Sequence, residues 1–458
     1  MLFWKQIFHP VNPTIMPKTF KKGGVHPHDC KLSSGREIFT LNLPDSVTVP
    51  LQQHIGAVPF LEVNVGDKVK AGQRIATAQG FVSSNIHAPI SGTVKKIDNI
   101  TDIYGYKNKA VVIERDGDDW IEGIDLSDNY VPDTSLSIEE IRRRINEAGI
   151  VGLGGATFPT HVKLAIPPGK TAEIIVVNGV ECEPYLTCDH RIILEKGREI
   201  LAGTALLMKV LNLDKAFIGI EINKPDAIKY MSEHIKNFPG IKIQPLQVKY
   251  PQGGEKQLIE AITGRRIPSG KIPVDVGVVP FNIASVFAIY EAVNKNKPLI
   301  ERIITVTGPS VTNPCNLRVR IGTPVENLLN IAGGIPEDTG KIIAGGPMMG
   351  RTIVNIDAPV TKGISGLLLI PEKSSFRKPE SNCIRCARCV NACPMGLEPY
   401  LLERISSRKL YDKAEQEYIT DCIECGSCSF TCPANKPLLD NIRLGKAAVL
   451  KIIKSRRS

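Results

Sequence analysis

Eight of the twelve cysteines fall into two short groups near the C-terminus. In each group three cysteines are separated by two residues, and a fourth follows after three further residues, directly before a proline. Three thiolates at this spacing can hold three corners of a [4Fe–4S] cubane, while the displaced fourth cysteine reaches a second cluster. The spacing therefore predicts two clusters, the first on Cys383, Cys386, Cys389 and Cys432 and the second on Cys422, Cys425, Cys428 and Cys393.

A mononuclear zinc site is the alternative for these cysteines. Zinc prefers two Cys-x2-Cys pairs or mixtures of Cys and His, and such a site has no use for the third cysteine, the displaced fourth or the proline. The cubane interpretation is therefore favoured. Residues 372–458 resemble bacterial two-cluster ferredoxins, which predicts a helical domain that exchanges single electrons.

A glycine-rich segment at residues 152–163 offers bare backbone that could approach a ligand closely. A capping box and isoleucines at helical spacing predict a helix over Ser137–Ala148, directly before this segment. A dinucleotide fingerprint should instead follow a strand, so the segment alone indicates a tight turn at least as readily as a cofactor loop. However, residues 173–177 read as a buried strand, and the polar residues after it lie where open α/β sheets place ligands.

Four stretches occur in one order along the chain: 152–163, 178–184, 250–266 and 279–285. As a set they resemble the flavin- and NADH-binding subunit of respiratory complex I. The resemblance implies that Phe158, Glu183 and Glu255 face the nicotinamide dinucleotide, with the two glutamates as catalytic residues. The cofactor-binding residues that it implies, apart from Phe158, are Gly152, Gly154, Gly155, Lys163, Asn178, Glu181, Gly253, Gly254 and Asn282.

The chain departs from that family at three positions beside the expected ligand. Leu153 stands in place of an arginine, Thr157 in place of a glycine and Val180 in place of an aspartate. These changes alter charge and backbone freedom at the site, so the sequence leaves the affinity for NADH open.

The sequence as a whole predicts a multidomain α/β and α+β protein. Residues 1–130 contain an alternating, turn-rich pattern that resembles a barrel-sandwich (lipoyl/biotinyl-like) domain. The tip of this domain, between Gly80 and Ala88, has no lysine to modify, so we expect a docking module and not a swinging arm. Residues 131–300 are predicted to form a Rossmann-like FMN/NADH domain, 301–371 a β-grasp domain, and 372–458 the two-cluster domain with a basic tail.

The stretch Phe20–His28 completes a resemblance to one family that combines these parts in this order, the C subunits of Rnf (Rsx) membrane complexes. The resemblance implies a peripheral subunit on the cytoplasmic face of the membrane. Its complex would couple electron transfer between NAD(H) and ferredoxin to ion translocation. The implied partners are the ferredoxin-like B subunit and the membrane subunits, with ferredoxin as an indirect partner; we expect no nucleic acid partner.

Composition restricts the remaining classes. The chain has no apolar run of about eighteen residues, the length of a membrane-spanning helix, and prolines at positions 10, 13 and 17 interrupt any secretory signal. The net charge of +10 arises partly from the tail, which could meet an anionic surface or an acidic partner, or could simply be a solvated helix end. The tail cations are Arg443, Lys446, Lys451, Lys454, Arg456 and Arg457.

The cofactors together suggest a division of labour. Nicotinamide exchanges two electrons as hydride and each cluster moves one, and a flavin is the usual converter between them. We expect hydride exchange at FMN near residues 152–163, followed by single-electron transfer through the two clusters. A cobalamin reductase, a soluble hydrogenase or dehydrogenase subunit, and a non-catalytic ferredoxin-like scaffold are competing interpretations.

Overall fold

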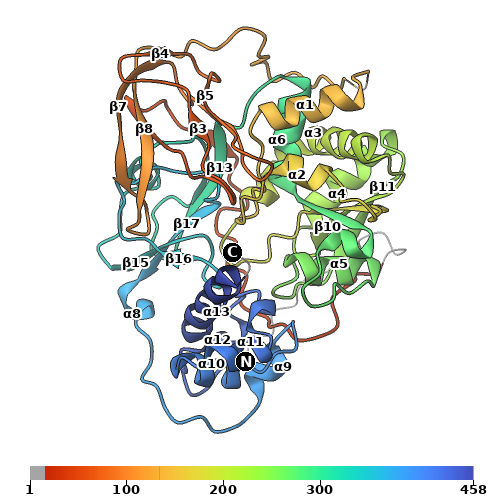
Figure 1. The fold of residues 1–458 in the computed structure, drawn as a ribbon, viewed down its shortest axis with the longest axis vertical. Coiled ribbons are helices and arrows are strands. Elements are labelled where there is room, and N and C mark those ends of the chain that lie inside the picture. The colour runs from red at the N-terminus through yellow and green to blue at the C-terminus, as the bar shows by residue number, and fades with distance from the viewer. Residues whose placement is uncertain (1–15, 134, 457–458) are drawn as a thin grey trace.

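The computed structural model describes residues 16–133 and 135–456. Figure 1 shows a small β domain beside an α/β domain, a mixed sheet behind and below the β domain, and a helical domain at the lower end. These four parts correspond to the predicted architecture. Prolines 10 and 13 and Arg457, which entered the sequence interpretation, lie outside the described residues.

The β domain consists of two antiparallel sheets around one core. One sheet has the order β2 (Ser46–Pro50), β8 (Lys107–Arg115), β7 (Gly92–Thr101) and β4 (Lys68–Val69), and the other has β3 (Phe60–Leu61), β5 (Arg74–Thr77) and β6 (Ile86–His87). Alternate residues point inward, so Val47 and Val49 are fully buried together with Val111 and Ile113. This arrangement is the predicted barrel sandwich.

The α/β domain is built on a four-stranded parallel sheet. Its order is β11 (Ile241–Leu246), β10 (Ala216–Glu221), β9 (Ile174–Asn178) and β12 (Val278–Asn282). One face of the sheet packs on α1 (Ile138–Glu147), α3 (Cys188–Leu211), α4 (Pro225–His234) and α6 (Ile283–Asn294), and the other on α5 (Glu255–Thr263). Because both faces are covered, the central strands β9 and β12 are nearly continuous apolar runs, whereas the edge strand β11 carries Lys242 and Gln244.

The third part is a mixed six-stranded sheet. Its order is β1 (Ile38–Thr40), β14 (Cys315–Arg320), β13 (Glu301–Thr307), β17 (Gly366–Pro371), β15 (Thr339–Ala344) and β16 (Arg351–Thr352). The helix α7 (Val325–Ile331) buries Val325, Leu328 and Leu329 in the core of this part. Strand β1 comes from the segment before the barrel sandwich and pairs in parallel with β14.

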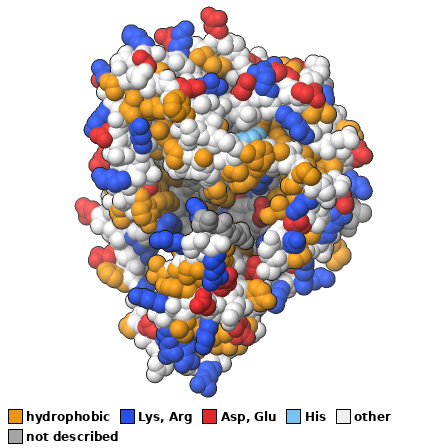
Figure 2. Space-filling view, viewed as in Figure 1, with side chains coloured by type: hydrophobic (Ala, Val, Ile, Leu, Met, Phe, Trp, Pro, Cys, Tyr) orange, Lys and Arg blue, Asp and Glu red, His pale blue; other side chains and the backbone are white. Residues whose placement is uncertain are grey.

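The helical domain follows α8 (Glu372–Ser375) and an irregular segment that reaches Ala387. It contains α9 (Arg388–Ala392), α10 (Pro399–Ser407), α11 (Tyr411–Gln416), α12 (Ser427–Phe430) and α13 (Leu438–Ser455). Ile442 and Val449 of α13 are buried with Leu402 and Ile405 of α10. On the face seen in Figure 2, many Lys and Arg side chains gather over this lower end of the molecule.

Residues 16–37, here called the strap, cross three of the parts before β1. Lys18 forms a parallel bridge with Leu246 at the end of β11, and Val25 exchanges both backbone hydrogen bonds with Tyr250. Gly24 then donates its N–H to the carbonyl of Ala392 in the helical domain, at 2.9 Å. Within the described residues, no helix has the length and apolar character needed to cross a membrane.

Candidate functional site

The α/β sheet changes direction between β9 and β12. The chain passes from β9 outward to β10 and β11 and then returns to add β12 on the other side of β9. Open α/β sheets bind ligands at this kind of switch point, outside the carboxyl ends of the strands. Asn178 ends β9 and Asn282 ends β12, and the two residues pair directly across the switch point. Both were predicted to bind the cofactor.

The glycine-rich loop lies over this switch point. It begins after α1 and leads into the short helix α2 (Thr160–Leu164), and it is closed by a hydrogen bond of 2.8 Å from Gly152 N–H to the Phe158 carbonyl. A Cβ atom at Gly154 would touch Asn282, whereas one at Gly155 would meet nothing within 4 Å. The loop thus rests on the sheet with one side and offers open backbone on the other, which fits a flavin or phosphate group.

The structure shows the surroundings of two residues that depart from the expected motif, Thr157 and Leu153. Thr157, which replaces a glycine, keeps the backbone conformation that a glycine would adopt, with φ at +50°. A β-branched residue is strained in this region. The amide of Leu153, which replaces an arginine, donates to Ser285 Oγ at 2.8 Å, and the Leu153 side chain is buried. Arg302, itself buried, donates to the Leu153 carbonyl, so a guanidinium reaches this loop from another part of the chain.

The remaining predicted residues converge from neighbouring loops. Asn178 Nδ2 donates to the Gly253 carbonyl at 2.9 Å, and Gly254 caps the N-terminus of α5. Lys163 Nζ lies 3.6 Å from the Glu255 carboxylate and donates to the Pro280 carbonyl at 3.1 Å. A lysine at this position adds positive charge beside the open loop, as a phosphate site requires.

Glu181 has a structural role in addition to its predicted one. Its carboxylate accepts hydrogen bonds from the backbone N–H groups of Asp189 and His190 and so caps the first turn of α3. Asp189 is buried beside it and accepts a hydrogen bond from Asn282 Nδ2 at 2.8 Å. Burial, together with the charge of Glu181, raises the pKa of Asp189 to about 7.

Glu183 is held by the loop between β15 and β16 of the mixed sheet and by Tyr250. Its carboxylate accepts hydrogen bonds from the N–H groups of Met348 and Met349, and the hydroxyl oxygen of Tyr250 lies 3.3 Å from it. The same hydroxyl donates to the carbonyl of Cys425 at 2.7 Å. Burial raises the pKa of Glu183. The predicted contact of Glu183 with a dinucleotide stays a prediction. Through Tyr250, the surroundings of Glu183 are connected to Cys425, a predicted cluster ligand.

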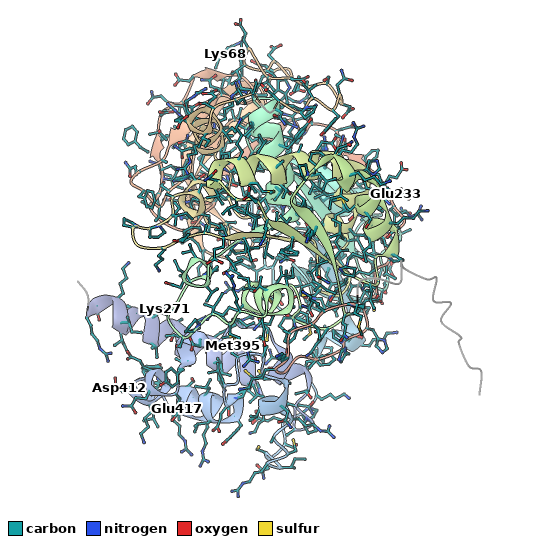
Figure 3. All side chains as sticks on the ribbon, turned by 90° about the vertical axis from the view of Figure 1, so that its right-hand side faces the viewer. Lys68, Glu233, Lys271, Met395, Asp412 and Glu417 are labelled. Atoms are coloured by element: carbon teal, nitrogen blue, oxygen red, sulfur yellow. The ribbon has the colours of Figure 1, made fainter. Side chains whose placement is uncertain are left out.

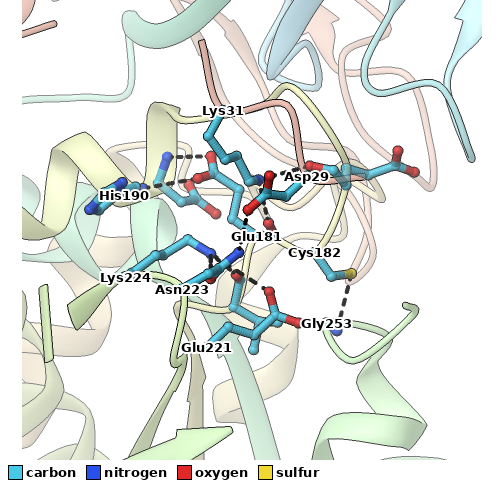
Figure 4. A network of polar contacts seen from close by, with 12 residues as sticks. Asp29, Lys31, Glu181, Cys182, His190, Glu221, Asn223, Lys224 and Gly253 are labelled. Atoms are coloured by element: carbon cyan, nitrogen blue, oxygen red, sulfur yellow. Dashed lines mark hydrogen bonds and ion pairs between the residues drawn. The ribbon is translucent and has the colours of Figure 1, made fainter. Parts of the chain in front are cut away.

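Two lysines, the partly buried Lys31 and the fully buried Lys224, support the segment that carries these glutamates (Figure 4). Lys31 of the strap donates to the carbonyls of Glu181, Glu183 and Leu186 at 2.7–2.9 Å. Lys224 donates to the Val180 carbonyl at 2.7 Å and pairs with Glu221. Burial lowers the pKa of Lys31, and the charge of Lys224 lowers it further. The sequence pattern did not single out either lysine.

The tip of the barrel sandwich docks on the glycine-rich loop. Ile55 donates its N–H to the Thr157 carbonyl at 3.3 Å, and His161 of α2 contacts the Phe81 carbonyl at 3.0 Å. Nearby, the buried Lys362 donates to the carbonyls of Asn85 and Gly149. This contact gives the expected docking module a partner within the chain, which sequence could not show because the contacts join distant segments.

The second cysteine set is buried and faces the α/β domain. Cys393, Cys425 and Cys428 are each less than 10% exposed, and Cys393, Cys422, Cys425 and Cys428 line one apolar cavity with Met395. Met395 lies close to α5, whose Gln257 donates to its sulfur at 3.3 Å (Figure 3). Burial, together with the charges of Cys425, Cys422 and Cys393, raises the pKa of the Cys428 thiol to about 12. These neighbours are the set assigned to the second cluster.

The first set lies at the surface. Cys383 and Cys386 are exposed, and Cys389 and Cys432 are partly buried. Burial raises the pKa of Cys389, and the charge of Cys432 contributes to this shift, as expected for two ligands of one cluster. The cluster assignments otherwise stay predictions.

The described residues contain one compact group of potential metal ligands. Within the described part of the chain, the only group of three or more potential ligand atoms within 4.8 Å of one another is Glu181, Cys188 and Asp189. A tetrahedral zinc with Zn–S bonds of about 2.3 Å would bring its sulfurs to within about 4 Å. None of the cysteine sets among the described residues is that compact, and the preference for cubanes rests on the residue spacing.

Family comparisons agree with the four parts. Residues 18–118 match the RnfC barrel sandwich hybrid domain and residues 145–291 the Nuo51 FMN-binding domain. Residues 303–352 match the SLBB domain, and residues 376–433 match a 4Fe-4S dicluster domain. The predicted FMN-binding and two-cluster domains, with their cofactor classes, are therefore confirmed.

Two curated relatives are similar over most of their length. The C subunit of the proton-translocating ferredoxin:NAD(+) oxidoreductase complex of Clostridium ljungdahlii is 47% identical over 88% of this chain and 88% of the relative. The C subunit of the Na(+)-translocating complex of Acetobacterium woodii is 43% identical over 94% of this chain and 97% of the relative. A solved NAD+-reducing [NiFe]-hydrogenase chain is 15% identical, covers 69% of this chain and 66% of its own, and gives a TM-score of 0.47.

Proposed function

The chain belongs to the family of C subunits of ion-translocating ferredoxin:NAD+ oxidoreductase complexes, and we propose that it exchanges electrons with NAD(H) at the switch point of its α/β sheet. The observation that carries this proposal is the convergence of the glycine-rich loop, Asn178, Asn282 and Lys163 at that point. FMN bound there would interconvert hydride and single-electron chemistry. The open backbone of Gly155 and the ammonium of Lys163 would bind and orient it.

Burial supports an order for the two clusters. The second set lies against Tyr250 and α5 of the α/β domain, whereas the first set holds two exposed cysteines. Electrons would therefore pass between the α/β domain and the second cluster, and between the first cluster and a partner. Either direction of flow is compatible with this order.

The surface near the first set supports a protein partner for that step. Phe376 and Ile384 are 73% and 68% exposed, and Arg385 and Arg388 lie beside the cysteines in the sequence. Exposed apolar side chains flanked by cations suit an acidic electron carrier. In this family such a carrier would be the ferredoxin-like B subunit, with the membrane subunits of the complex performing ion translocation. The chain would then be a peripheral component on the cytoplasmic face.

Anaerobic titration with NADH tests the proposal. The purified, reconstituted chain is titrated while flavin absorbance and the cluster EPR signals are followed together. We expect the flavin to bleach and at least one cluster to become reduced. If no FMN is retained, or if NADH leaves the flavin oxidised, the protein is a non-catalytic ferredoxin-like scaffold.

A cobalamin reductase and a soluble hydrogenase component are both disfavoured by the curated relatives. Neither would be expected to match C subunits of these complexes at over 40% identity along nearly their whole length. Co-sedimentation with membranes separates these classes further, because a C subunit should be held there by its partners.

A further inference from the structure

The strap meets the α/β domain and the second cluster at one buried joint. Val25 of the strap packs with Tyr250 of the α/β domain and with Ala392 and Cys425 of the helical domain. Cys182, Met348 and Ile423 pack against the same group. The strap, the α/β domain, the mixed-sheet part and the helical domain therefore all contribute side chains to one small core around a cluster ligand.

Glycine is required where the strap crosses this joint. Gly23 has φ at +69°, and a Cβ atom there would lie 2.5 Å from the backbone C and O of Cys393 and 2.7 Å from Pro394 N. These are backbone atoms of a predicted cluster ligand and of the residue that follows it, so no side-chain movement can relieve the contact. The next residue, Gly24, donates to the Ala392 carbonyl. The strap thus holds the Ala392–Pro394 segment at backbone distance.

A few residues later the strap holds the other side of the joint. The ammonium of Lys31 binds three carbonyls between Glu181 and Leu186, and Asp29 accepts the N–H of Tyr185 through its backbone carbonyl. This segment begins at Asn178, at the switch point, and through Glu183 and Tyr250 it reaches the Cys425 carbonyl. One stretch of the strap, residues 23–31, therefore fixes both the loop that leaves the flavin site and the segment that carries Cys393.

We propose that residues 23–31 of the strap are a positioning element of the redox site, which sets the placement of the second cluster relative to the switch point. The proposal rests on the cofactor assignment of the proposed function. Gly23 and Lys31 do not touch the reacting atoms. Gly23 acts through the backbone of Cys393, and Lys31 acts through the segment that carries Glu183, which lies beside Tyr250. The strap is therefore part of the electron-transfer site.

The test compares two alanine substitutions that share one backbone conformation. Gly23→Ala and Gly270→Ala both place a side chain at φ +69°, but the Cβ at position 270 would meet nothing within 4 Å. Both are made in the full chain with Cys386→Ser as their common parent, so that any difference between the two EPR spectra arises from position 23 or position 270. A redox titration with a chemical reductant then gives the potential and the spectrum of the second cluster.

We expect Gly23→Ala to shift the potential and the EPR line shape, or to abolish the second cluster's signal, while Gly270→Ala leaves both unchanged. Identical potentials and spectra in the two variants would overturn the proposal. Because the reductant replaces NADH, this experiment still reports if the proposed NADH reaction fails. Conversely, NADH can bleach the flavin even if the strap has no influence on the cluster.

A second pair keeps the test informative if Gly23→Ala does not fold. Lys31→Met removes the ammonium that binds the 181–186 segment, whereas Lys18→Met removes a strap lysine that donates to the Ile262 carbonyl, at the end of α5. The proposal predicts a shifted potential for Lys31→Met and an unchanged one for Lys18→Met. Equal behaviour of the two lysine variants would count against a positioning role.

Discussion

At the level of single residues, the site combines an open ligand-facing side with a charged interior. Arg302 donates to the Leu153 carbonyl of the glycine-rich loop, and Glu181 and Asp189 lie at the start of α3. Lys31 and Lys224 bind carbonyls of residues 180–186. Buried charges of this kind are stable only when each has partners. Here their partners are mostly backbone groups of the loops that must hold the flavin, so charge burial and loop geometry depend on each other.

Asp189 makes the stability of this interior dependent on pH. Its pKa rises from 3.8 in the unfolded chain to about 7 in the folded one, mainly through burial. A raised carboxyl pKa contributes stability that is fully present below about pH 4 and is lost as the pH rises through 7. We expect Asp189→Asn to be more stable than the parent at pH 8, by on the order of a few kcal/mol, and similar to it at pH 4.

Chemical denaturation at several pH values measures this difference, and exposed Asp214 changed to Asn serves as the control. Equal destabilisation of the Asp189 variant at both pH values would show that the carboxylate is needed by Asn282. In that case burial of the Asp189 carboxylate would not be what destabilises the folded chain at high pH.

At the level of elements, the barrel sandwich and the glycine-rich loop act as one unit. The tip of the barrel sandwich contributes contacts to Thr157 and α2, and Lys362 joins it to the end of α1. The loop has internal backbone hydrogen bonds from Gly152 to Phe158 and from Thr157 to Gly152, and the docked tip adds contacts from outside the loop.

Gly149 lies in this docking contact. Its φ is +64°, and a Cβ atom there would lie 2.4 Å from the Asn85 carbonyl. We expect Gly149→Ala to displace the tip, to destabilise the chain by roughly 1–3 kcal/mol more than a glycine change in open space, and to weaken FMN retention. Hydrogen exchange of residues 79–85 should increase.

Gly169→Ala is the matched control, because Gly169 has φ at +78° and nothing within 4 Å of its Cβ position. If both variants lose equal stability and protect residues 79–85 equally, the docking contact does not contribute to the site.

At the level of the whole molecule, the two cysteine sets differ in exposure, and this difference suggests an inner and an outer cluster. The buried set faces the α/β domain, and the exposed set lies at the surface of the helical domain near exposed apolar and basic side chains. A carrier arranged in this way keeps its inner cluster away from solvent and presents its outer cluster to a partner.

Serine substitutions at the two sets should therefore have different effects. Cys386→Ser should disturb the outer cluster, leave reduction of the inner cluster by NADH intact and block transfer to an external carrier. Cys425→Ser should prevent NADH from reducing either cluster while the flavin still bleaches. EPR after mixing with NADH, together with iron analysis against about eight irons per chain for two intact cubanes, distinguishes the outcomes. The reverse pattern would show that the exposed set lies next to the flavin.

Sequence alone determined the features that are local. The cysteine spacing predicted the cubanes because three ligands of each cluster come from one short turn. The helix over 137–148 and the strand at 173–177 also follow from local signals, and the structure agrees with both. The order of the four parts came from the resemblance to a known family, and the family comparisons show the same order.

The tertiary structure decided the relations between distant segments. Nothing in the sequence pattern indicates that Gly23 lies against Cys393, that Lys31 binds the 181–186 carbonyls, or that Ile55 contacts Thr157. These contacts depend on how four separate cores pack, and a lysine or glycine carries no local signal of a partner more than a hundred residues away. Chain chemistry specified which cofactors can bind, and packing specified how they are placed relative to one another.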